Sequence, residues 1–533
     1  MLEGLEICEV PIRNLERTLR LDSEFYSKEN IAQVNSLQEM NATSLCNIAS
    51  VSDGNHMSIS DSFVENGIPY YRGGDIYNPF IEFATNSLKI PYDVFAQTTM
   101  VRSHLQKGDV LMSIVGAIIG NVSIVTTDNN ATCSCKLAII RPKEGISSEY
   151  LATFLRSKYG QKQIQKFRRG TGQTGLILED FDQLLIPQVG KDIQTRIQTI
   201  LNKSLYCATQ SARLYDEAEA SLLNHIGIGD FTASSNSCNV KALKESFIET
   251  GRLDAEYYQP KYDDILHHIQ AYKYGSKHLA EICDIKDENF SPKDNTTYKY
   301  VELANIGKYG NITGCSQQKG ENLPSRARRI VTKDDVVVSS LEGSLDRCAL
   351  VEEDYDGALC STGFYVLKSS VLNSETLLVL FKSPLVKELM RKGCSGTILT
   401  AIGRQELERI PIPLIRQEIQ EEIAQHVQSS ISLRKESLQL LEHAKLTVEG
   451  AIQNGGGKIV SEYNVLQEKS AMELHIAIYL LLHEVGIISN DVKVKVSNVV
   501  CSCKKLSDSF LASGRLDAEY YQPKYDLLFE KLK

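Results

Sequence analysis

The chain has 533 residues, of which 42% are hydrophobic and 23% are charged, and its net charge is −9. This length exceeds a single hydrophobic core, so we expect about three or four domain-sized units. The 13 cysteines do not indicate a secreted, disulfide-bonded protein, because the opening residues MLEGLEICEV are acidic and contain no apolar signal segment. We therefore expect a cytoplasmic protein with free thiols. The longest apolar run, 472–488, is interrupted by charged residues and histidines, which favours a buried helix over a membrane span.

Metal and cofactor sites are not expected. The closest cysteine pairs, Cys133/Cys135 and Cys501/Cys503, have no further cysteine or histidine at the spacing of a zinc site. No phosphate-binding loop of the G-x-x-x-x-G-K-[ST] type is present. We predict no metal and no cofactor.

A short phrase occurs three times along the chain. LRLDSEFYSKEN stands at 19–30, GRLDAEYYQPKYD stands at 251–263, and the same sequence recurs at 514–526. Each of the first two copies precedes a much larger repeated region.

The larger repeat appears when the chain is displaced by 226 residues. Asp109-Val110 then meets Asp335-Val336, and Ile186-Pro187 meets Ile412-Pro413. Each copy begins with extended segments rich in β-branched and aromatic residues, and continues through a glycine-containing hairpin and a helix. A basic, glycine-bearing loop and a short strand ending in proline close it. We predict two tandem copies of one mixed α/β globule, an α+β fold.

A long helical pattern follows each globule, over roughly 192–226 and 417–452. Its apolar residues recur mostly three, four and seven apart and pair between the copies, as in Ile197/Ile423 and Leu201/Val427. A stripe this long requires a partner of similar length, so we predict that the two helices pack as an antiparallel coiled coil with pseudo-twofold symmetry. About 35 residues at 1.5 Å each give a rod of roughly 50 Å.

The order of globule, helix, globule and helix resembles the DNA specificity (S) subunits of type I restriction-modification enzymes. The resemblance extends to about Ile452 and is carried first by GIPYYRGGDI and GDVLMSIVG in the first copy. It is also carried by GLILEDFDQLLIPQVGKDIQTRI and ILTAIGRQELERIPIPLIRQEIQEEI at the ends of the two copies. The first copy departs from the family pattern only at Gln188-Val189, where a second proline would continue the strand.

The resemblance implies that each globule is a target recognition domain that reads one half of a bipartite sequence in double-stranded DNA. It also implies that two adenine methyltransferase (M) subunits and motor-nuclease (R) subunits join the chain, with no membrane partner. We expect an N-terminal phrase segment at 1–30, recognition domains at 31–189 and 266–415, spacer helices at 190–228 and 416–453, a second phrase segment at 229–265, and a C-terminal appendage with the third phrase at 454–533.

Catalytic motifs are absent from the sequence. An adenine methyltransferase needs an N-P-P-Y or D-P-P-Y turn to hold a flipped base, and the chain has no Pro-Pro pair. It also has no Pro-Asp dipeptide, with which the usual metal-nuclease motif begins. We therefore predict a non-catalytic subunit. A non-catalytic repeat scaffold and a stand-alone restriction endonuclease remain as alternatives.

Local charge identifies candidate DNA contacts although the net charge is negative. Between Arg141 and Gly170 there are eight basic and two acidic residues. Cations beside glycines, which let the backbone approach a phosphate, occur at matching places in the two copies. In the strand Tyr70-Tyr71-Arg72, alternation predicts that at least one residue is core. The predicted DNA-binding residues are Lys166, Arg168, Arg169, Gly170, Arg326, Arg328, Arg329, Arg391, Lys392, Gly393, Tyr71 and Arg72.

Two explanations of the threefold phrase stay open. It could dock a methyltransferase subunit, because the resemblance implies that the N- and C-terminal segments come together. Alternatively, the identity of two copies could reflect a recombination site in the DNA, at which recognition domains are exchanged.

Overall fold

The structure is a computed structural model, and it divides into two compact units, Met1–Gly456 and Gly457–Lys533. It describes residues 9–12, 20–84, 87–170, 174–228, 234, 236, 238–286, 288–396 and 400–453. The third copy of the phrase and the apolar run 472–488 lie outside the described residues. Among the helices that are described, none combines the length and the hydropathy needed to cross a bilayer.

The first globule is built around a four-stranded antiparallel sheet with the order β2-β8-β5-β6. A smaller sheet, β4-β3-β7, contains one parallel pair, β3 with β7. The strands β1 and β9 pair with each other. The main elements are α1 (Lys28–Glu39), β1 (Thr43–Ser44), α2 (Leu45–Ile48), β2 (Ala49–Asp53), β3 (Ile68–Tyr71), β4 (Leu88–Ile90), α3 (Tyr92–Phe95), β5 (Val110–Ser113), β6 (Val122–Ile124), β7 (Thr132–Cys133), β8 (Leu137–Pro142), α4 (Ser148–Arg156), α5 (Lys158–Phe167) and β9 (Leu185–Ile186).

The second globule repeats this connectivity. Its larger sheet has the order β11-β18-β15-β16, and its smaller sheet, β13-β12-β17-β14, has one strand more than the first globule's. The main elements are α7 (Pro260–Gln270), β10 (Ser276–His278), α8 (Leu279–Ile282), β11 (Cys283–Lys286), β12 (Thr297–Val301), β13 (Ser316–Lys319), β14 (Ala327–Ile330), β15 (Val336–Ser339), β16 (Cys348–Leu350), β17 (Leu359–Ser361), β18 (Phe364–Ser369), α9 (Ser374–Lys382), α10 (Pro384–Gly393), β19 (Cys394–Ser395), β20 (Ala401–Ile402), α11 (Arg404–Glu408) and β21 (Pro411–Pro413).

The strands β5 and β15 lack the usual alternation of apolar and polar residues. They read VLMS and VVVS, and every residue in both is buried. Alternate residues of a strand face opposite sides of the sheet. Val110 and Met112 accordingly join the core that contains α4, whereas Leu111 joins the core shared with the smaller sheet. A continuous apolar run fits a strand whose two faces are both covered.

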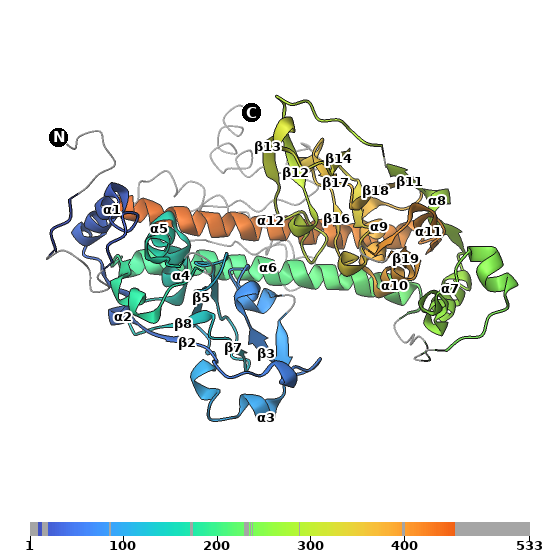
Figure 1. The fold of residues 1–533 in the computed structure, drawn as a ribbon. Helices are drawn as coiled ribbons and strands as arrows, with labels where there is room; N and C mark the ends of the chain where they lie inside the picture. Colours follow the sequence, from blue (N-terminus) through green and yellow to red (C-terminus); the bar gives the residue numbers. More distant parts are fainter. Residues whose placement is uncertain are drawn as a thin grey trace, which may run out of the picture. The chain divides into compact units, whose positions relative to one another are not determined.

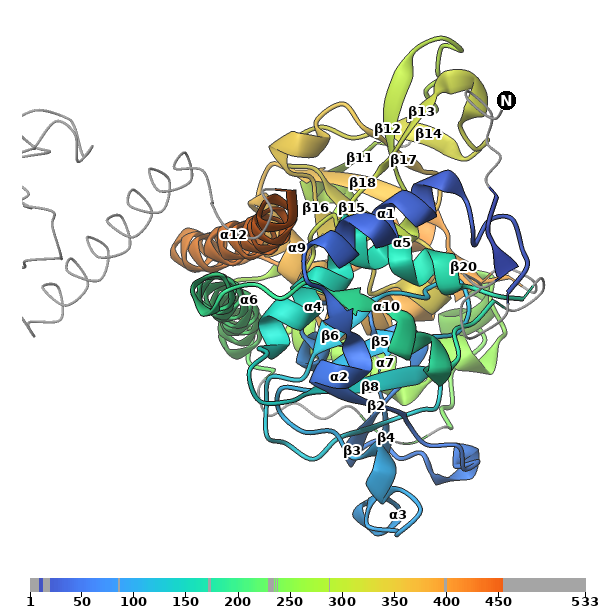
Figure 2. The same cartoon turned by 90° about the vertical axis from the view of Figure 1, so that its left-hand side faces the viewer.

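The two long helices are α6 (Lys191–His225) and α12 (Gln417–Gln453), of 35 and 37 residues. They lie side by side in both views of the ribbon (Figures 1 and 2). The core of the first globule includes the N-terminal half of α6 and the C-terminal end of α12, and the core of the second globule includes the opposite ends. Each globule therefore packs against both helices, at opposite ends of the pair.

Two serine pairs set the register of these helices. Ser204 Oγ lies 2.9 Å from Ser437 Oγ, and Ser211 Oγ lies 3.0 Å from Ser430 Oγ. The residue number falls by seven on α12 as it rises by seven on α6, so the helices run antiparallel. Each hydroxyl is also within hydrogen-bond distance of the partner's main-chain carbonyl, so these buried polar groups have partners. The predicted apolar stripe omitted this polar seam.

The same serines are related by the internal repeat of 226 residues. A displacement of 226 residues turns Ser204 into Ser430 and Ser211 into Ser437, so the operation exchanges one pair for the other. Together with the shared connectivity of the two globules, this confirms the predicted fold class: an α+β protein with two tandem globules and two long helices.

Candidate nucleic-acid interface

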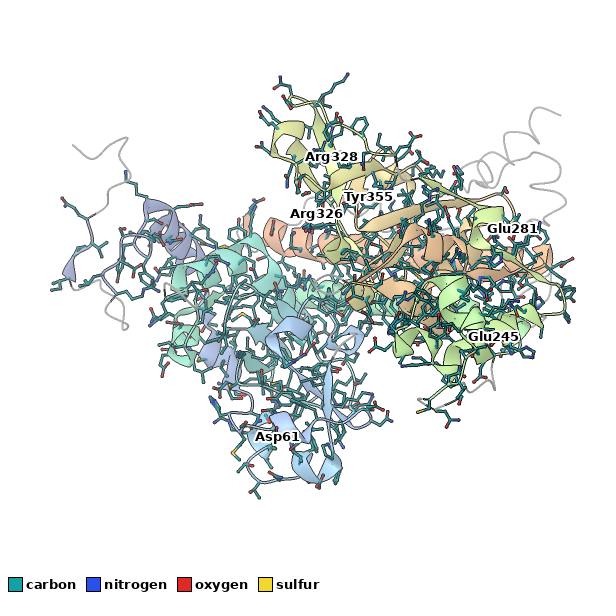
Figure 3. The ribbon with its side chains drawn as sticks, turned by 45° about the vertical axis from the view of Figure 1, so that its right-hand side comes forward. Asp61, Glu245, Glu281, Arg326, Arg328 and Tyr355 are labelled. Carbon is teal, nitrogen blue, oxygen red and sulfur yellow. The ribbon has the colours of Figure 1, made fainter. Side chains whose placement is uncertain are left out.

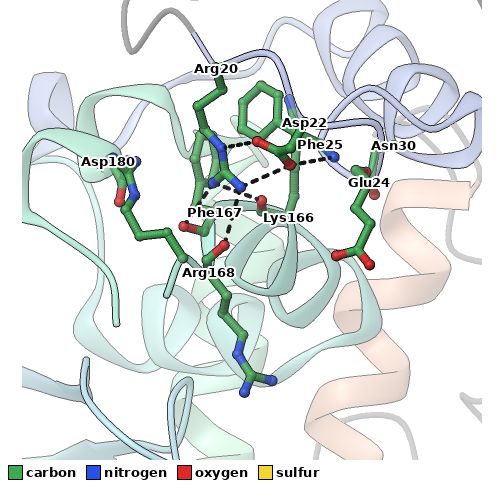
Figure 4. A network of polar contacts seen from close by, with 10 residues as sticks. Arg20, Asp22, Glu24, Phe25, Asn30, Lys166, Phe167, Arg168 and Asp180 are labelled. Carbon is green, nitrogen blue, oxygen red and sulfur yellow. Dashed lines mark hydrogen bonds and ion pairs between the residues drawn. The ribbon is translucent and has the colours of Figure 1, made fainter. Parts of the chain in front are cut away.

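The basic loop after α5 is the place where the first copy of the phrase docks (Figure 4). The Arg20 guanidinium donates to the carbonyls of Phe167 at 3.1 Å and of Lys166 and Arg168 at 3.3 Å. Asp22 accepts from Arg20 at 2.7 and 3.0 Å, and this bond lowers the pKa of Asp22. Carbonyls at a helix C-terminus lack partners within the helix and carry partial negative charge. The arginine of the phrase therefore caps α5.

The second copy docks in the same way at the end of α10. Arg252 donates to the Cys394 carbonyl at 3.3 Å and to Asp254 at 2.5 and 2.8 Å. The Arg252 guanidinium lies 4.3 Å from the centre of the Tyr257 ring, and Lys392 Nζ lies 4.7 Å from it. Neither Arg20 nor Arg252 was among the predicted site residues, although the repetition of R-L-D along the chain was a signal for a shared role.

Several predicted DNA-binding cations take part in this docking or have other protein partners. Lys166 Nζ lies 4.1 Å from the centre of the Phe25 ring, and burial lowers the pKa of Lys392. Arg169 forms an ion pair with Asp180, whose side chain is completely buried, and burial raises the pKa of that carboxyl group. Arg391 pairs with Glu388 one turn earlier on α10.

The two glycines of these loops serve different needs. Gly170 has a φ of +100°, a conformation that favours glycine. A Cβ atom at Gly393 would lie 2.9 Å from Glu406 Cβ and Ile402 Cδ1, so close packing against the neighbouring elements requires glycine there.

Arg326, Arg328 and Arg329 come from β14 and the turn before it, and the first two are labelled in Figure 3. The Arg326 side chain is 63% exposed and lies 3.7 Å from Glu302. Arg328 is partly buried as a residue, and its guanidinium donates to the Ser325 carbonyl at 2.9 Å in an exposed hydrogen bond. Arg329 is half-buried and donates to the Lys286 carbonyl at 3.3 Å. Arg326 and Arg328 therefore present their charge at the surface, whereas Arg329 points inward.

Two of the three residues in the segment Tyr70-Tyr71-Arg72 are buried. Tyr70 and Tyr71 are each 6% exposed, and burial raises the pKa of Tyr71 to about 12. The Arg72 side chain is 49% exposed. Its main-chain N–H donates to Asp75 at 2.7 Å, which fixes the turn that follows the strand. Of the three, only Arg72 presents its side chain outward.

Comparison with known families identifies the first half of the chain. Residues 37–220 match the model of the type I restriction modification DNA specificity domain. The match spans most of the first globule and much of α6, and the second globule repeats the connectivity of the matched one. No curated protein matches the chain.

Two solved structures of S subunits align with most of the chain. The type I restriction-modification S subunit from M. genitalium is 13% identical, with a TM-score of 0.37, over 79% of this chain and 96% of that chain. The HsdS subunit from Thermoanaerobacter tengcongensis is 14% identical, with a TM-score of 0.26, over 78% of this chain and 96% of that chain.

The two globules present different side chains at one equivalent position. Arg72 precedes a one-turn helix in the first globule, and Glu302 precedes the corresponding helix in the second. Both main-chain N–H groups bond to the residue three places on, Asp75 or Asn305, so the backbone is the same. Within the described part of the chain, no group of three or more histidine, cysteine or acidic side chains could hold a metal ion.

Proposed function

We propose that the chain is the non-catalytic specificity subunit of a type I restriction-modification enzyme, and that each globule reads one half of a bipartite target in double-stranded DNA. The observation that carries the proposal is the repetition of one globule at opposite ends of an antiparallel helix pair. The 35 residues of α6 span about 52 Å, which exceeds one turn of DNA at about 34–36 Å. Two readers at that separation would leave an unread spacer between their half-sites.

DNA contact would come from the cations that are accessible. Arg72 and Arg168 would act for the first globule, and Arg326 and Arg328 for the second. The partly buried Arg168 side chain donates to Gln165 in an exposed bond and to Thr174 at 3.2 Å. Phosphate contacts from such residues position a protein on DNA and make its affinity depend on salt. The other predicted residues hold the protein's own segments, so we assign them a supporting role: Lys166, Arg169, Gly170, Arg329, Arg391, Lys392, Gly393 and Tyr71.

Partner subunits would bind along the helix pair. Tyr206 on α6 and Leu438 on α12 are 61% and 57% exposed, and exposed aromatic and aliphatic side chains serve as anchors at interfaces. We assign this surface to two adenine methyltransferase subunits in the cytoplasm, with motor-nuclease subunits completing the restriction enzyme. The chemistry would then reside in the partners.

Selection from a random duplex library tests the proposal. The chain is co-purified with an adenine methyltransferase subunit of a type I system, and bound DNA is sequenced after several rounds. We expect enrichment of two defined blocks separated by an undefined spacer of constant length. A single contiguous block would refute the division of labour between the globules. Absence of enrichment would favour a scaffold, and Mg²⁺-dependent cleavage by the chain alone would favour a stand-alone endonuclease.

A further inference from the structure

Arg102 occupies the place in the first globule that Arg328 occupies in the second. The two arginines are 226 residues apart, which is the displacement of the internal repeat. Three residues after them, the N–H groups of Leu105 and Val331 donate at 3.0 and 2.9 Å to the carbonyl that immediately precedes β7 or β17. The backbone is therefore equivalent around both arginines. The Arg102 side chain is 54% exposed, so the first globule also presents a cation beside its smaller sheet.

Asp53, the last residue of β2, fixes the direction of this side chain. Arg102 Nη2 donates to Asp53 Oδ1, and the two residues form an ion pair. His56 Nε2 lies 2.6 Å from Asp53 Oδ2. An ionised carboxylate only accepts hydrogen bonds, so this nitrogen is the donor. Asp53 is 9% exposed, whereas the His56 side chain is 59% exposed. The protein therefore covers the carboxylate and leaves the two donor side chains accessible.

The segments that carry these side chains are fixed to the end of the smaller sheet. Next to His56, the Asn55 N–H donates to the Cys133 carbonyl at 2.8 Å, and the Cys135 N–H donates to the Asn55 carbonyl at 2.9 Å. Next to Arg102, Ser103 is completely buried, and its Oγ lies 2.7 Å from Thr132 Oγ1 in β7. Side chains on a rigid support keep the geometry that recognition of a ligand requires.

The guanidinium of Arg102 is less engaged than that of Arg141. Arg141 donates from Nε and Nη2 to the two oxygens of Asp109 at 2.7 and 2.8 Å, and from Nη2 to the His104 carbonyl at 3.3 Å. Within the described part of the chain, Arg102 uses Nη2 alone, for one oxygen of Asp53. A guanidinium carries its N–H donors in a planar fork. Most of the donors of Arg102 are therefore left for a ligand.

The negative charge of Asp53 decides which part of DNA this fork fits. It offsets the charge of Arg102 and repels a phosphate group, so a contact with the DNA backbone is disfavoured. An uncharged base edge is not repelled. In the major groove, guanine presents the two acceptors O6 and N7, which a bidentate arginine matches, whereas adenine presents a donor beside its acceptor. The arrangement therefore suits guanine.

We propose that Arg102, held by Asp53, reads a guanine in the half-site of the first globule, and that His56 positions the carboxylate by binding its second oxygen. The inference rests on the proposed function and deepens it, because it names one base of the target and the residue that reads it. Arg102 was not among the predicted site residues, because no glycine and no second cation stand beside it in the sequence.

Selection from a random duplex library tests the reading of guanine. The full chain is co-purified with an adenine methyltransferase subunit of a type I system, as wild type and as the variants Arg102→Ala and Arg102→Lys. Both variants should lose one G·C pair from one half-site and keep the spacer and the other half, because lysine keeps the charge but lacks the fork. In competition binding, a preference of roughly 10- to 100-fold for G·C over A·T at that pair should disappear.

Lys107→Ala is the matched control for these variants. Its side chain is 59% exposed and also pairs with a carboxylate of the first globule, that of Asp128. The control should keep the whole motif. Equal changes in Lys107→Ala and Arg102→Ala would show a general effect of charge and would overturn the assignment of Arg102.

Asp53→Asn tests the positioning role separately. Asparagine keeps the size of the side chain and removes its charge, so discrimination at the same base pair should fall. Affinity for noncognate DNA should rise, because the negative charge no longer opposes phosphate. Thermal unfolding identifies the variants that are folded. A parallel fall of both affinities in a folded Asp53→Asn protein would overturn the positioning role, and the exposed Arg102 variants test the reading of guanine independently of this substitution.

The remaining outcomes separate the inference from the proposed function. If Arg102→Ala weakens binding to all duplexes alike and flattens the salt dependence by about one unit, Arg102 contacts a phosphate and the reading of guanine is wrong. A motif that Arg102→Ala leaves unchanged would show that Arg102 does not read the target. Either result leaves the bipartite motif of the wild type intact. A wild-type chain that enriches no bipartite motif would refute the proposed function, and this inference with it.

Discussion

Lengthening the helix pair should move the two half-sites apart by an amount that the seam of the pair dictates. Ser204 and Ser211 face Ser437 and Ser430, so residues added to α6 alone would break the register of the seam. Whole heptads must be inserted in both helices, between the two serines of each. The globules and their docking segments are then left unchanged.

The geometry of DNA decides which insertion is tolerated. One heptad adds about 10.5 Å, or about three base pairs at roughly 3.4 Å each. Three base pairs rotate the DNA by about 100° about its axis. Seven residues of straight α-helix make almost two turns and fall short of them by only about 20°. Three heptads add about 31 Å, or about nine base pairs. Nine base pairs rotate the DNA by about 50° less than one full turn. Three heptads rotate the helix by about 60° less than a whole number of turns, so the two rotations nearly agree.

Two insertion variants therefore have opposite expected results. With three heptads in each helix, methylome sequencing should show the same two half-sites with a spacer longer by about nine base pairs. With one heptad, the globules would face different sides of the DNA, and methylation should fall strongly. A three-heptad variant that methylates the original motif, or a one-heptad variant that retains full activity, would refute the assignment of the helix pair as the ruler.

Four further predictions concern single contacts. Arg252→Ala should lower the free energy of unfolding by about 1–2 kcal/mol, because a main-chain hydrogen bond and an ion pair are lost at a partly exposed site. Arg328→Ala should change the free energy of unfolding little, and calorimetry compares the two variants. The folded pKa of Asp254 lies below its ordinary value of 3.8, so the loss in Arg252→Ala should be complete above that pH and should shrink as the pH falls through the folded pKa; urea titrations at several pH values check this. Arg434 lies 4.6 Å from the centre of the Tyr309 ring and donates to Asn311 and Ser211, and burial lowers its pKa to about 10. Arg434→Ala should destabilise the second globule by about 1.5–3 kcal/mol. Amide hydrogen exchange should then become faster in that globule. Arg326→Ala with Arg328→Ala should weaken binding to cognate and noncognate DNA alike and flatten the slope of log K against log salt by about two units; an effect confined to one base pair would instead indicate base reading.

Large repeated features could be predicted from the sequence. The displacement of 226 residues found both globules, because apolar strands such as VLMS and VVVS occupy the same place in each sheet. The helices α6 and α12 were visible as long stretches with apolar spacing and without proline. Periodicity of this kind reports which face of an element is buried, and it survives even when few residues are identical.

Individual contacts were harder to predict. The phosphate contacts of the basic residues beside glycines stay a prediction, whereas the contacts of Lys166 and Lys392 with aromatic rings of the docked phrases were not predicted. Arg169 neutralises a buried aspartate that comes 11 residues later. The serine seam was not predicted because serine is a polar residue and was not counted in the apolar stripe. Burying a serine hydroxyl costs little free energy when the facing helix supplies a hydrogen-bond partner. For the lysines and the serines the contacting group lies more than 100 residues away in the sequence, whereas the partner of Arg169 comes 11 residues later.

The methylome of the host tests the central claim most directly. Single-molecule sequencing is applied to the parent strain and to a strain that lacks this gene, with expression of the protein confirmed in the parent. We predict that the deletion removes one N6-methyladenine motif, made of two defined halves and an undefined spacer, and that the intact gene restores it. An unchanged methylome, or the loss of a motif with a single uninterrupted block, would contradict the account.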